Sequence, residues 1–141
     1  MKLCSACLLG IRCRYDGKSK PDKEVIALSK KETLIPVCPE QLGGLPTPRK
    51  PSEGKGAKVI TKSGKDVTKN FKIGASQVLK LARLLDIKEA IFKQRSAACG
   101  CGKIYDGSFS RKTIKGDGIA TALLKKNGIK VMGEDALQHE K

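Results

Sequence analysis

The chain of 141 residues is poor in aromatic side chains: it has no tryptophan, and aromatic residues make up only 4% of it. So few aromatics provide no evident stacking platform for single-stranded nucleic acid. Long hydrophobic runs are also missing, since no apolar stretch approaches the roughly 20 residues that a membrane-spanning helix requires. The apolar stretch near the N-terminus is too short for a signal peptide. These absences favour a cytoplasmic protein without a membrane partner.

Histidine is nearly absent, because His139 is the only one, and this disfavours a zinc site with mixed cysteine and histidine ligands. The length fits a single domain, 1–141, which can bury a core of its own without disulfide bonds. Cysteine, by contrast, is plentiful, with six residues at positions 4, 7, 13, 38, 99 and 101. In an intracellular chain such cysteines indicate metal binding or redox chemistry rather than a disulfide framework.

Acidic residues are few: 14 Asp and Glu against 29 Lys and Arg give a formal net charge of +15. This charge favours anionic partners such as polyanions or phosphorylated ligands. The lysines are scattered over predicted helix surfaces, which is typical of a role in solubility. The arginines in predicted loops beside cysteine or glycine are Arg12, Arg14, Arg49, Arg95 and Arg111. Such loop arginines suit anion recognition as well as structural roles.

Hydrophobic periodicity predicts short strands that alternate with helices. The strands are expected over 1–7, 34–38, 89–93 and 129–132, and the helices over 22–31, 68–86 and 118–127. Residues 57–61 are expected to form a further strand or hairpin arm, whereas the segments 39–56 and 95–107 are expected to be loops. This alternation predicts an α/β fold with a mostly parallel sheet and helices on both faces.

Three cysteines lie at one edge of the predicted sheet. Cys7 follows the first strand, Cys38 ends the second, and Cys99 lies in the loop after the third. Because ligands of open parallel sheets collect outside the carboxyl ends of the strands, these thiols are expected to share one crevice. Convergent thiolates indicate a metal ion or an iron–sulfur cluster, although buried cysteines are also common as small hydrophobic residues. Three thiolates on a [4Fe–4S] cluster leave the fourth iron as a Lewis acid open to substrate.

The other cysteines allow more than one interpretation. Cys4 and Cys7 form a Cys-x-x-Cys pair, which occurs in thioredoxin-like redox sites and in zinc knuckles. The second pair that a zinc ribbon needs is missing, however, and Cys4 is expected to be buried in the first strand. Cys13 and Cys101 lie near the expected site as spare ligands or oxidation-prone thiols.

Two residues in the cysteine loops supply groups for catalysis. Glu40, two residues after Cys38, is a carboxylate suited to general acid–base chemistry, or alternatively an acceptor for loop backbone N–H groups. Ser96, three residues before Cys99, is able to donate a hydrogen bond to a substrate, although serines of this kind more often cap a turn. Residues that line the expected pocket and bind substrate, each on weaker grounds, are Arg14, Tyr15, Asp16, Arg49 and Asp106.

Six segments together resemble a known family: SACLLG (5–10), CRYDG (13–17), PVCPEQLGGLPTPR (36–49), DVT (66–68), IYDGSF (104–109) and GDG (116–118). This family was first described as a domain of unknown function, and its characterised members are TudS-like thiouracil desulfurases. The resemblance covers nearly the whole chain, and its most specific part is the long segment around Cys38.

The resemblance implies a Rossmann-like α/β domain that binds an oxygen-sensitive [4Fe–4S] cluster through Cys7, Cys38 and Cys99. It further implies that the free iron binds the sulfur of a thiocarbonyl and that water replaces this sulfur without net redox change, which yields an oxo pyrimidine and sulfide. Glu40 then transfers a proton or activates water, and Ser96 orients the substrate or relays a proton. The family commonly has Ser-Pro-Ser-Cys-Gly where this chain has Ser-Ala-Ala-Cys-Gly at 96–100, which loosens the backbone before the cysteine and removes a polar contact.

We therefore expect a [4Fe–4S]-dependent desulfurase that acts on a thiolated pyrimidine base, nucleoside or nucleotide, and the basic loops favour a phosphorylated substrate. A competing hypothesis is a basic zinc- or cluster-containing module that binds nucleic acid without catalysis. A third is a thiol redox protein that uses Cys4 and Cys7.

Overall fold

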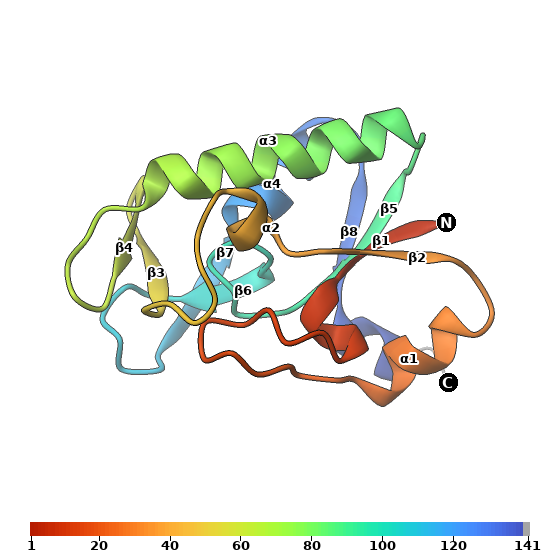
Figure 1. Cartoon of the computed structure of the whole chain (residues 1–141), viewed down its shortest axis with the longest axis horizontal. Coiled ribbons are helices and arrows are strands. Elements are labelled where there is room, and N and C mark those ends of the chain that lie inside the picture. The colour runs from red at the N-terminus through yellow and green to blue at the C-terminus, as the bar shows by residue number, and fades with distance from the viewer. Residues whose placement is uncertain (140–141) are drawn as a thin grey trace.

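The structure is a computed structural model that describes residues 1–139. At its centre lies a four-stranded parallel sheet with the strand order β2–β1–β5–β8 (Figure 1). Its strands are β1 (Lys2–Ser5), β2 (Leu34–Val37), β5 (Glu89–Phe92) and β8 (Lys130–Gly133). All four coincide with predicted strands, and the predicted parallel α/β architecture is confirmed.

Helices cover both faces of this sheet (Figure 1). They are α1 (Lys23–Ser29), α3 (Thr68–Leu84), α4 (Ile119–Lys126) and the 3₁₀ helices η1 (Ala6–Leu9) and η2 (Glu134–His139). Leu3 and Ala90 belong to the core shared with α3 and α4, whereas their neighbours Cys4 and Ile91 belong to a second core with α1 and η1. Successive strand residues point to opposite faces, which produces these two cores. None of the helices within residues 1–139 combines the length and apolar composition that a membrane crossing requires.

The strand order places a topological switch point at the carboxyl edge of the sheet. β2 lies on one side of β1, and the next parallel strand, β5, lies on the other side. At such a switch point the segments that leave adjacent strands diverge to opposite faces and leave room for a ligand. The segments that follow β1, β2 and β5, which carry the three predicted cysteine ligands, all start from this edge.

Two antiparallel hairpins extend from the same end of the molecule (Figure 1). The first joins β3 (Ser52–Lys55) to β4 (Lys58–Thr61), and the second joins β6 (Cys101–Tyr105) to β7 (Thr113–Asp117). The arm predicted at 57–61 is confirmed as β4.

The prediction that two segments are loops is wrong in part. The segment 39–56 contains the one-turn helix α2 (Pro39–Leu42) and the strand β3, and the segment 95–107 contains β6. These elements are short and rich in glycine, lysine or proline. Each of the two strands pairs with only one neighbouring strand. Their sequences therefore lack the hydrophobic alternation from which a half-buried strand is predicted.

A buried carboxylate joins the two hairpins. Glu53 on β3 is only 8% exposed, and its Oε1 accepts hydrogen bonds from the backbone N–H groups of Gly107 and Phe109 at 3.0 and 3.1 Å. Gly107 has a φ of 94°, and a Cβ atom there would lie 2.7 Å from the carbonyl oxygen of Gly54. Glycine is therefore required where the tip of the second hairpin meets β3.

Contacts between backbones fix α2 on α3. A Cβ atom at Gly43 would lie 2.0 Å from the carbonyl oxygen of Asn70, and one at Gly74 would lie 1.9 Å from the carbonyl oxygen of Pro39. The Asn70 side chain also donates a hydrogen bond to the Gly43 carbonyl oxygen at 2.9 Å. Since α2 begins directly after the second predicted cysteine ligand, this contact fixes the chain that follows that cysteine.

Replacing Gly74 with alanine is expected to lower the free energy of unfolding by about 1–3 kcal/mol, as at other overpacked sites. Alanine is the better helix former by roughly 1 kcal/mol, so the loss must come from the clash with Pro39. Urea denaturation measures the effect, and Ser76→Ala on the exposed side of α3 is the control. A Gly74→Ala protein as stable as the control would show that α2 does not depend on this contact.

Candidate functional site

The three cysteines predicted as ligands all lie at the carboxyl edge of the parallel sheet. Cys7 lies in η1 directly after β1, Cys38 stands between β2 and α2, and Cys99 lies in the loop between β5 and β6. Cys7 and Cys99 are buried, whereas Cys38 is partly exposed. The thiols of Cys38 and Cys99 are close enough for the charge of one to raise the pKa of the other.

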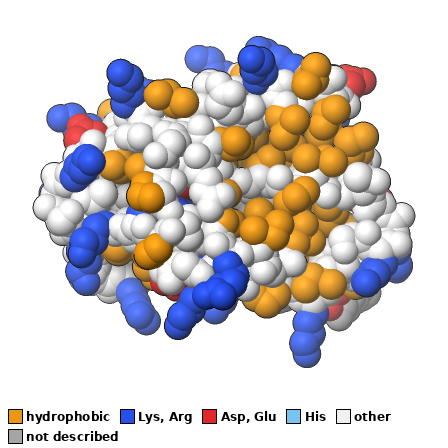
Figure 2. Space-filling model, viewed as in Figure 1, with side chains coloured by type: hydrophobic (Ala, Val, Ile, Leu, Met, Phe, Trp, Pro, Cys, Tyr) orange, Lys and Arg blue, Asp and Glu red, His pale blue; other side chains and the backbone are white. Residues whose placement is uncertain are grey.

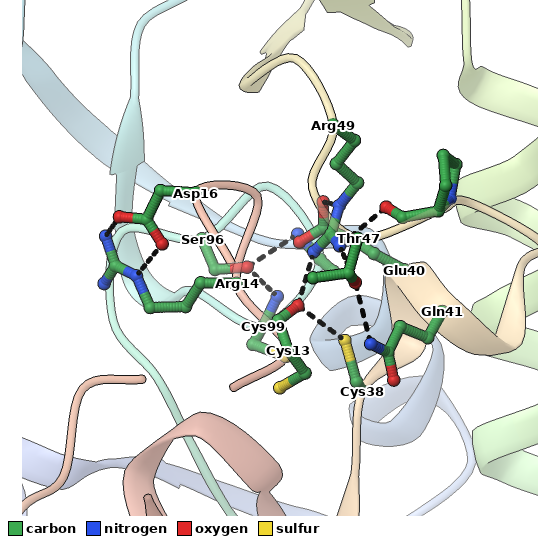
Figure 3. A network of polar contacts seen from close by, with 12 residues as sticks. Cys13, Arg14, Asp16, Cys38, Glu40, Gln41, Thr47, Arg49, Ser96 and Cys99 are labelled. Atoms are coloured by element: carbon green, nitrogen blue, oxygen red, sulfur yellow. Dashed lines mark hydrogen bonds and ion pairs between the residues drawn. The ribbon is translucent and has the colours of Figure 1, made fainter. Parts of the chain in front are cut away.

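A fourth cysteine, whose role the sequence leaves open, belongs to the same group. The pKa of the Cys13 thiol is raised to about 11: hydrogen bonding with Cys38 lowers it, whereas hydrogen bonding with Cys7 and burial raise it. The Cys38 thiol also donates a hydrogen bond to the Cys13 carbonyl oxygen at 3.7 Å (Figure 3). Cys13 is only 3% exposed. The clue in the sequence is its position, six residues after Cys7 in the loop that leaves the same strand.

The surroundings of the Cys38 and Cys99 thiols favour the protonated form of both. Burial is the main cause that raises the pKa of Cys99, against hydrogen bonds from Ser5 and Ser96 that lower it. The pKa of Cys38 is raised first by hydrogen bonding with Cys13 and then by burial. A metal centre reverses this balance, because its positive charge stabilises the thiolate form that binds it.

The donor set fits an iron–sulfur cluster. Thiols from Cys7, Cys38 and Cys99 are soft donors, which such clusters prefer. Within the described residues, no three His, Cys, Asp or Glu side chains are grouped as a single metal ion would require. Thiolates that hold a cluster bind different iron atoms, so they do not need to converge on one point. The three cysteines therefore supply the type of donor that an iron–sulfur cluster needs.

The other two cysteines have different surroundings. Cys4 is fully buried in β1, where its thiol donates to the Ser5 carbonyl oxygen at 3.5 Å and burial raises its pKa to about 12. These features fit the structural role expected of Cys4. The Cys101 thiol donates to the Val131 carbonyl oxygen at 3.2 Å and lies beside Lys125, so it faces β8 and α4.

A buried arginine connects the loops around the thiols (Figure 3). The Arg49 side chain is 6% exposed, and its Nε donates to Glu40 Oε1 at 3.1 Å. Its Nη1 donates to the Pro46 carbonyl oxygen and to Thr47 Oγ1 at 3.2 and 3.0 Å. Its Nη2 donates to the Cys13 carbonyl oxygen at 3.0 Å. These bonds commit the guanidinium group to the protein itself, which favours a positioning role over the predicted substrate contact.

The candidate proton-transfer group, Glu40, lies in the first turn of α2. Its side chain is 20% exposed, and Arg49 holds one of its oxygen atoms. The negative charge of Glu40 raises the pKa of both Cys38 and Cys99, so the carboxylate is close to both thiols. The structure thus places a partly exposed proton acceptor beside the predicted ligands.

Ser96 organises the loop before Cys99. Its Oγ accepts hydrogen bonds from the backbone N–H groups of Ala98 and Cys99 at 3.1 and 3.0 Å (Figure 3). Its side chain also forms a hydrogen bond with the Cys99 thiol that lowers the pKa of that thiol. Ser96 therefore caps a turn, as its alternative interpretation predicts, while its hydroxyl lies beside a candidate ligand.

The loop that carries Cys99 is docked on the N-terminus of α4. The carbonyl oxygens of Ala97 and Ala98 accept hydrogen bonds from the backbone N–H groups of Ile119 and Ala120, both at 2.9 Å. A Cβ atom at Gly118 would lie 2.4 Å from the carbonyl carbon of Ala98, so this approach requires glycine. The Ala98 side chain is buried in the core. Backbone contacts with α4 thus hold the loop although the proline of the family pattern is missing.

Three of the predicted substrate-binding residues, Arg14, Tyr15 and Asp16, share one loop. Arg14 forms an ion pair with Asp16 at 3.4 Å, and its guanidinium carbon lies 5.5 Å from the centre of the Tyr15 ring. The Tyr15 carbonyl oxygen accepts a hydrogen bond from the Arg49 backbone at 2.8 Å, which places this loop beside the thiols. Asp106 instead accepts hydrogen bonds from the serine two residues later, within the turn between β6 and β7.

Comparisons with known proteins agree over nearly the whole chain. The sequence pattern of the 2-thiouracil desulfurase family matches residues 3–136. The protein YbbK of Bacillus subtilis (strain 168) is 41% identical over 147 aligned residues, which cover 97% of each chain. The solved structure of the [4Fe-4S]-dependent thiouracil desulfidase TudS is similar with a TM-score of 0.91 and 44% identity, over 98% of this chain and 93% of that one.

Replacing Arg49 with methionine is expected to lower the free energy of unfolding by about 3 kcal/mol, because it leaves the Glu40 carboxylate without its charged donor and the Cys13 carbonyl oxygen with only the Cys38 thiol. Arg49→Lys is expected to recover only part of the loss, since one ammonium group cannot replace a planar fork of donors. Chemical denaturation measures both variants, and Arg83→Met on α3 is the control. A loss no greater than in Arg83→Met would show that Arg49 does not hold the loops together.

Proposed function

Because the chain belongs to the 2-thiouracil desulfurase family, we propose that it is an enzyme that converts a thiolated pyrimidine to its oxo form with the help of a [4Fe–4S] cluster. The observation that carries this proposal is the group of buried thiols at the carboxyl edge of the sheet, with Glu40 beside them. Water supplies the oxygen atom and sulfide leaves, so the reaction C=S + H₂O → C=O + H₂S balances without a change of oxidation state. Free cysteines at all six positions suit the reducing cytoplasm, where we propose that the protein works.

Cys7, Cys38 and Cys99 are the residues that would hold the cluster. When bound, the cluster supplies a Lewis-acidic iron without a protein ligand, which polarises the thiocarbonyl sulfur of the substrate. The role of the three thiols would be to hold the cluster at this edge of the sheet. Two of them are buried, which keeps bulk water away from most of the group.

Glu40 is the proposed general base. As a carboxylate it accepts the proton of the water molecule that attacks the thiocarbonyl carbon, and it returns a proton to the departing sulfur. Arg49 holds one carboxylate oxygen at 3.1 Å, so the other oxygen has a fixed direction. The oxygen of Ser96 accepts hydrogen bonds that organise the Cys99 loop. We propose that the same hydroxyl group, as a donor, orients the substrate or relays a proton.

The finer substrate class that we propose is a phosphorylated nucleoside. The loop with Arg14 and Tyr15 offers a guanidinium group and a partly exposed aromatic ring beside the thiols. A base can stack on such a ring, and a phosphate can pair with the guanidinium group. The net charge of +15 adds a long-range attraction for anionic substrates.

Anaerobic reconstitution followed by an assay of sulfide release from 2-thiouracil tests the reaction and its residues. Cys38→Ser is expected to lose the cluster and all turnover. Glu40→Gln is expected to keep the cluster but lose about 10²–10⁴-fold in rate, because glutamine keeps the contact with Arg49 and cannot accept the proton. Cys101→Ser, outside the group, is the matched control for iron content. An intact cluster with no sulfide release would contradict the proposed reaction.

The phosphate preference is tested with 4-thiouridine monophosphate and 4-thiouracil as substrates. We expect kcat/KM to be about tenfold higher for the monophosphate at low salt and the difference to shrink as salt screens the charges. Arg14→Gln is expected to reduce the preference, whereas Lys80→Gln on α3 is expected to leave it unchanged. Equal kcat/KM values at low salt would contradict the preference without affecting the proposed reaction.

A further inference from the structure

The two hairpins carry a concentration of positive charge that the proposed reaction does not use. Residues 50–66 and 101–117, which contain the hairpins, hold nine lysine and arginine residues against four acidic residues. All nine of these cations are exposed. The hairpins lie at the same end of the molecule (Figure 1), where Glu53 joins them through the N–H groups of Gly107 and Phe109. We call the exposed side chains of these two segments the hairpin surface.

The four acidic residues of these segments do not neutralise the nine cations. Glu53 is buried and accepts backbone hydrogen bonds. Asp66 and Asp106 each accept from the backbone N–H and the hydroxyl group of the threonine or serine two residues later. Asp117 pairs with Lys125 on α4, outside the hairpins. Within residues 1–139, every cation that forms an ion pair lies outside the two segments.

The register of both hairpins places lysine directly opposite lysine. Lys55 stands opposite Lys58 in the first hairpin, and Lys103 stands opposite Lys115 in the second. Like charges in directly opposite positions destabilise an antiparallel pair of strands. An acidic residue at one position of each pair would remove this cost and add an attraction. Two such pairs on adjoining hairpins therefore point to an anion that comes from outside the chain.

The extent of the hairpin surface indicates a polyanion. A five-residue strand such as β6 or β7 is about 17 Å long, so its lysines are too far apart to share one phosphate group. An anionic membrane is less suitable, since surfaces that bind membranes combine cations with several apolar side chains. Ile114 is the only large hydrophobic side chain of the described hairpin segments that is exposed. A nucleic-acid backbone needs phosphate contacts alone, so the scarcity of aromatic residues is no obstacle.

We infer that the hairpin surface binds the phosphate backbone of RNA. Each lysine that neutralises a phosphate releases a bound counterion, and this release supplies the free energy of binding. The choice of RNA over DNA rests on the proposed function, because uracil is the pyrimidine that distinguishes RNA. The exposed hydroxyl groups of Ser110 and Thr113, beside the cations of the second hairpin, are suited to contact the 2′-hydroxyl group that DNA lacks. The hairpin surface is distinct from the cysteine site and requires no cluster.

The experiment measures the affinity of the full-length protein for a fluorescently labelled RNA duplex of unmodified sequence, by anisotropy over a series of salt concentrations. The variants are Lys103→Gln/Lys115→Gln and Lys55→Gln/Lys58→Gln. Each is expected to bind about tenfold more weakly at low salt, and the slope of log K against log salt is expected to fall by about 1.8, or ~0.9 for each lost contact.

The control Lys30→Gln/Lys80→Gln removes the same charge from exposed positions outside the hairpins and is expected to bind as the wild type does. Thermal unfolding checks the fold of each protein. Both hairpin variants are expected to be at least as stable as the wild type, because each removes a pair of like charges.

Equal losses of affinity in the control and in the hairpin variants would overturn the inference, because net charge alone would then explain the binding. Binding to a DNA duplex of the same sequence, or to phosphatidylserine vesicles, that is as tight as binding to RNA would overturn it as well. A protein that releases sulfide from 2-thiouracil but does not bind the RNA duplex would overturn the inference and leave the proposed reaction standing. Binding that depends on the hairpin lysines in a protein without sulfide release would overturn the proposed reaction and leave the RNA surface standing.

Discussion

The side chain of Arg49 is the interaction on which the site depends. A buried guanidinium group must place its N–H donors on acceptors, because an unpaired buried charge is very costly. Arg49 finds these acceptors on Glu40, on the Cys13 carbonyl group and in its own proline-rich segment. One side chain thus joins the segments that follow β1 and β2, and neither can move without breaking charged hydrogen bonds. The same bonds occupy the guanidinium group of an arginine that the sequence predicts as a substrate contact.

The topology of the sheet, rather than a local sequence motif, brings the thiols together. Parallel strands all end at one edge, so short loops after β1, β2 and β5 bring thiols from distant parts of the chain together. Close backbone contacts then fix these loops on helices, at Gly43 and Gly74 for α2 and at Gly118 for the Cys99 loop. Hydrophobic residues are unevenly distributed over the surface, with a broad apolar area on the side shown in Figure 2 and lysine and arginine around it.

The sequence predicts the parts of the fold that have strong periodicity. The parallel strands and α3 are buried on at least one face, so their apolar residues recur with the spacing of the element. α2, β3, β6 and β7 escape prediction because they are stabilised by a neighbour that the sequence does not identify: α3 for α2, and one partner strand for each of the three strands. Within the site, the cysteines at strand ends are predictable, whereas the contacts of Cys13 are not, since they depend on the path of a loop without regular structure.

By itself, the sequence determines that a parallel α/β domain carries thiols at the carboxyl ends of its strands, with a glutamate close by. Residue type and periodicity are local properties, so the sequence alone shows them. Only the tertiary structure decides which groups share the site: it adds Cys13 to the thiols, directs Cys101 away, and turns Arg49 and Ser96 toward the protein itself. Hydrogen bonds, burial and charge compensation act between residues that are distant in sequence, and their balance is fixed only when the loops meet.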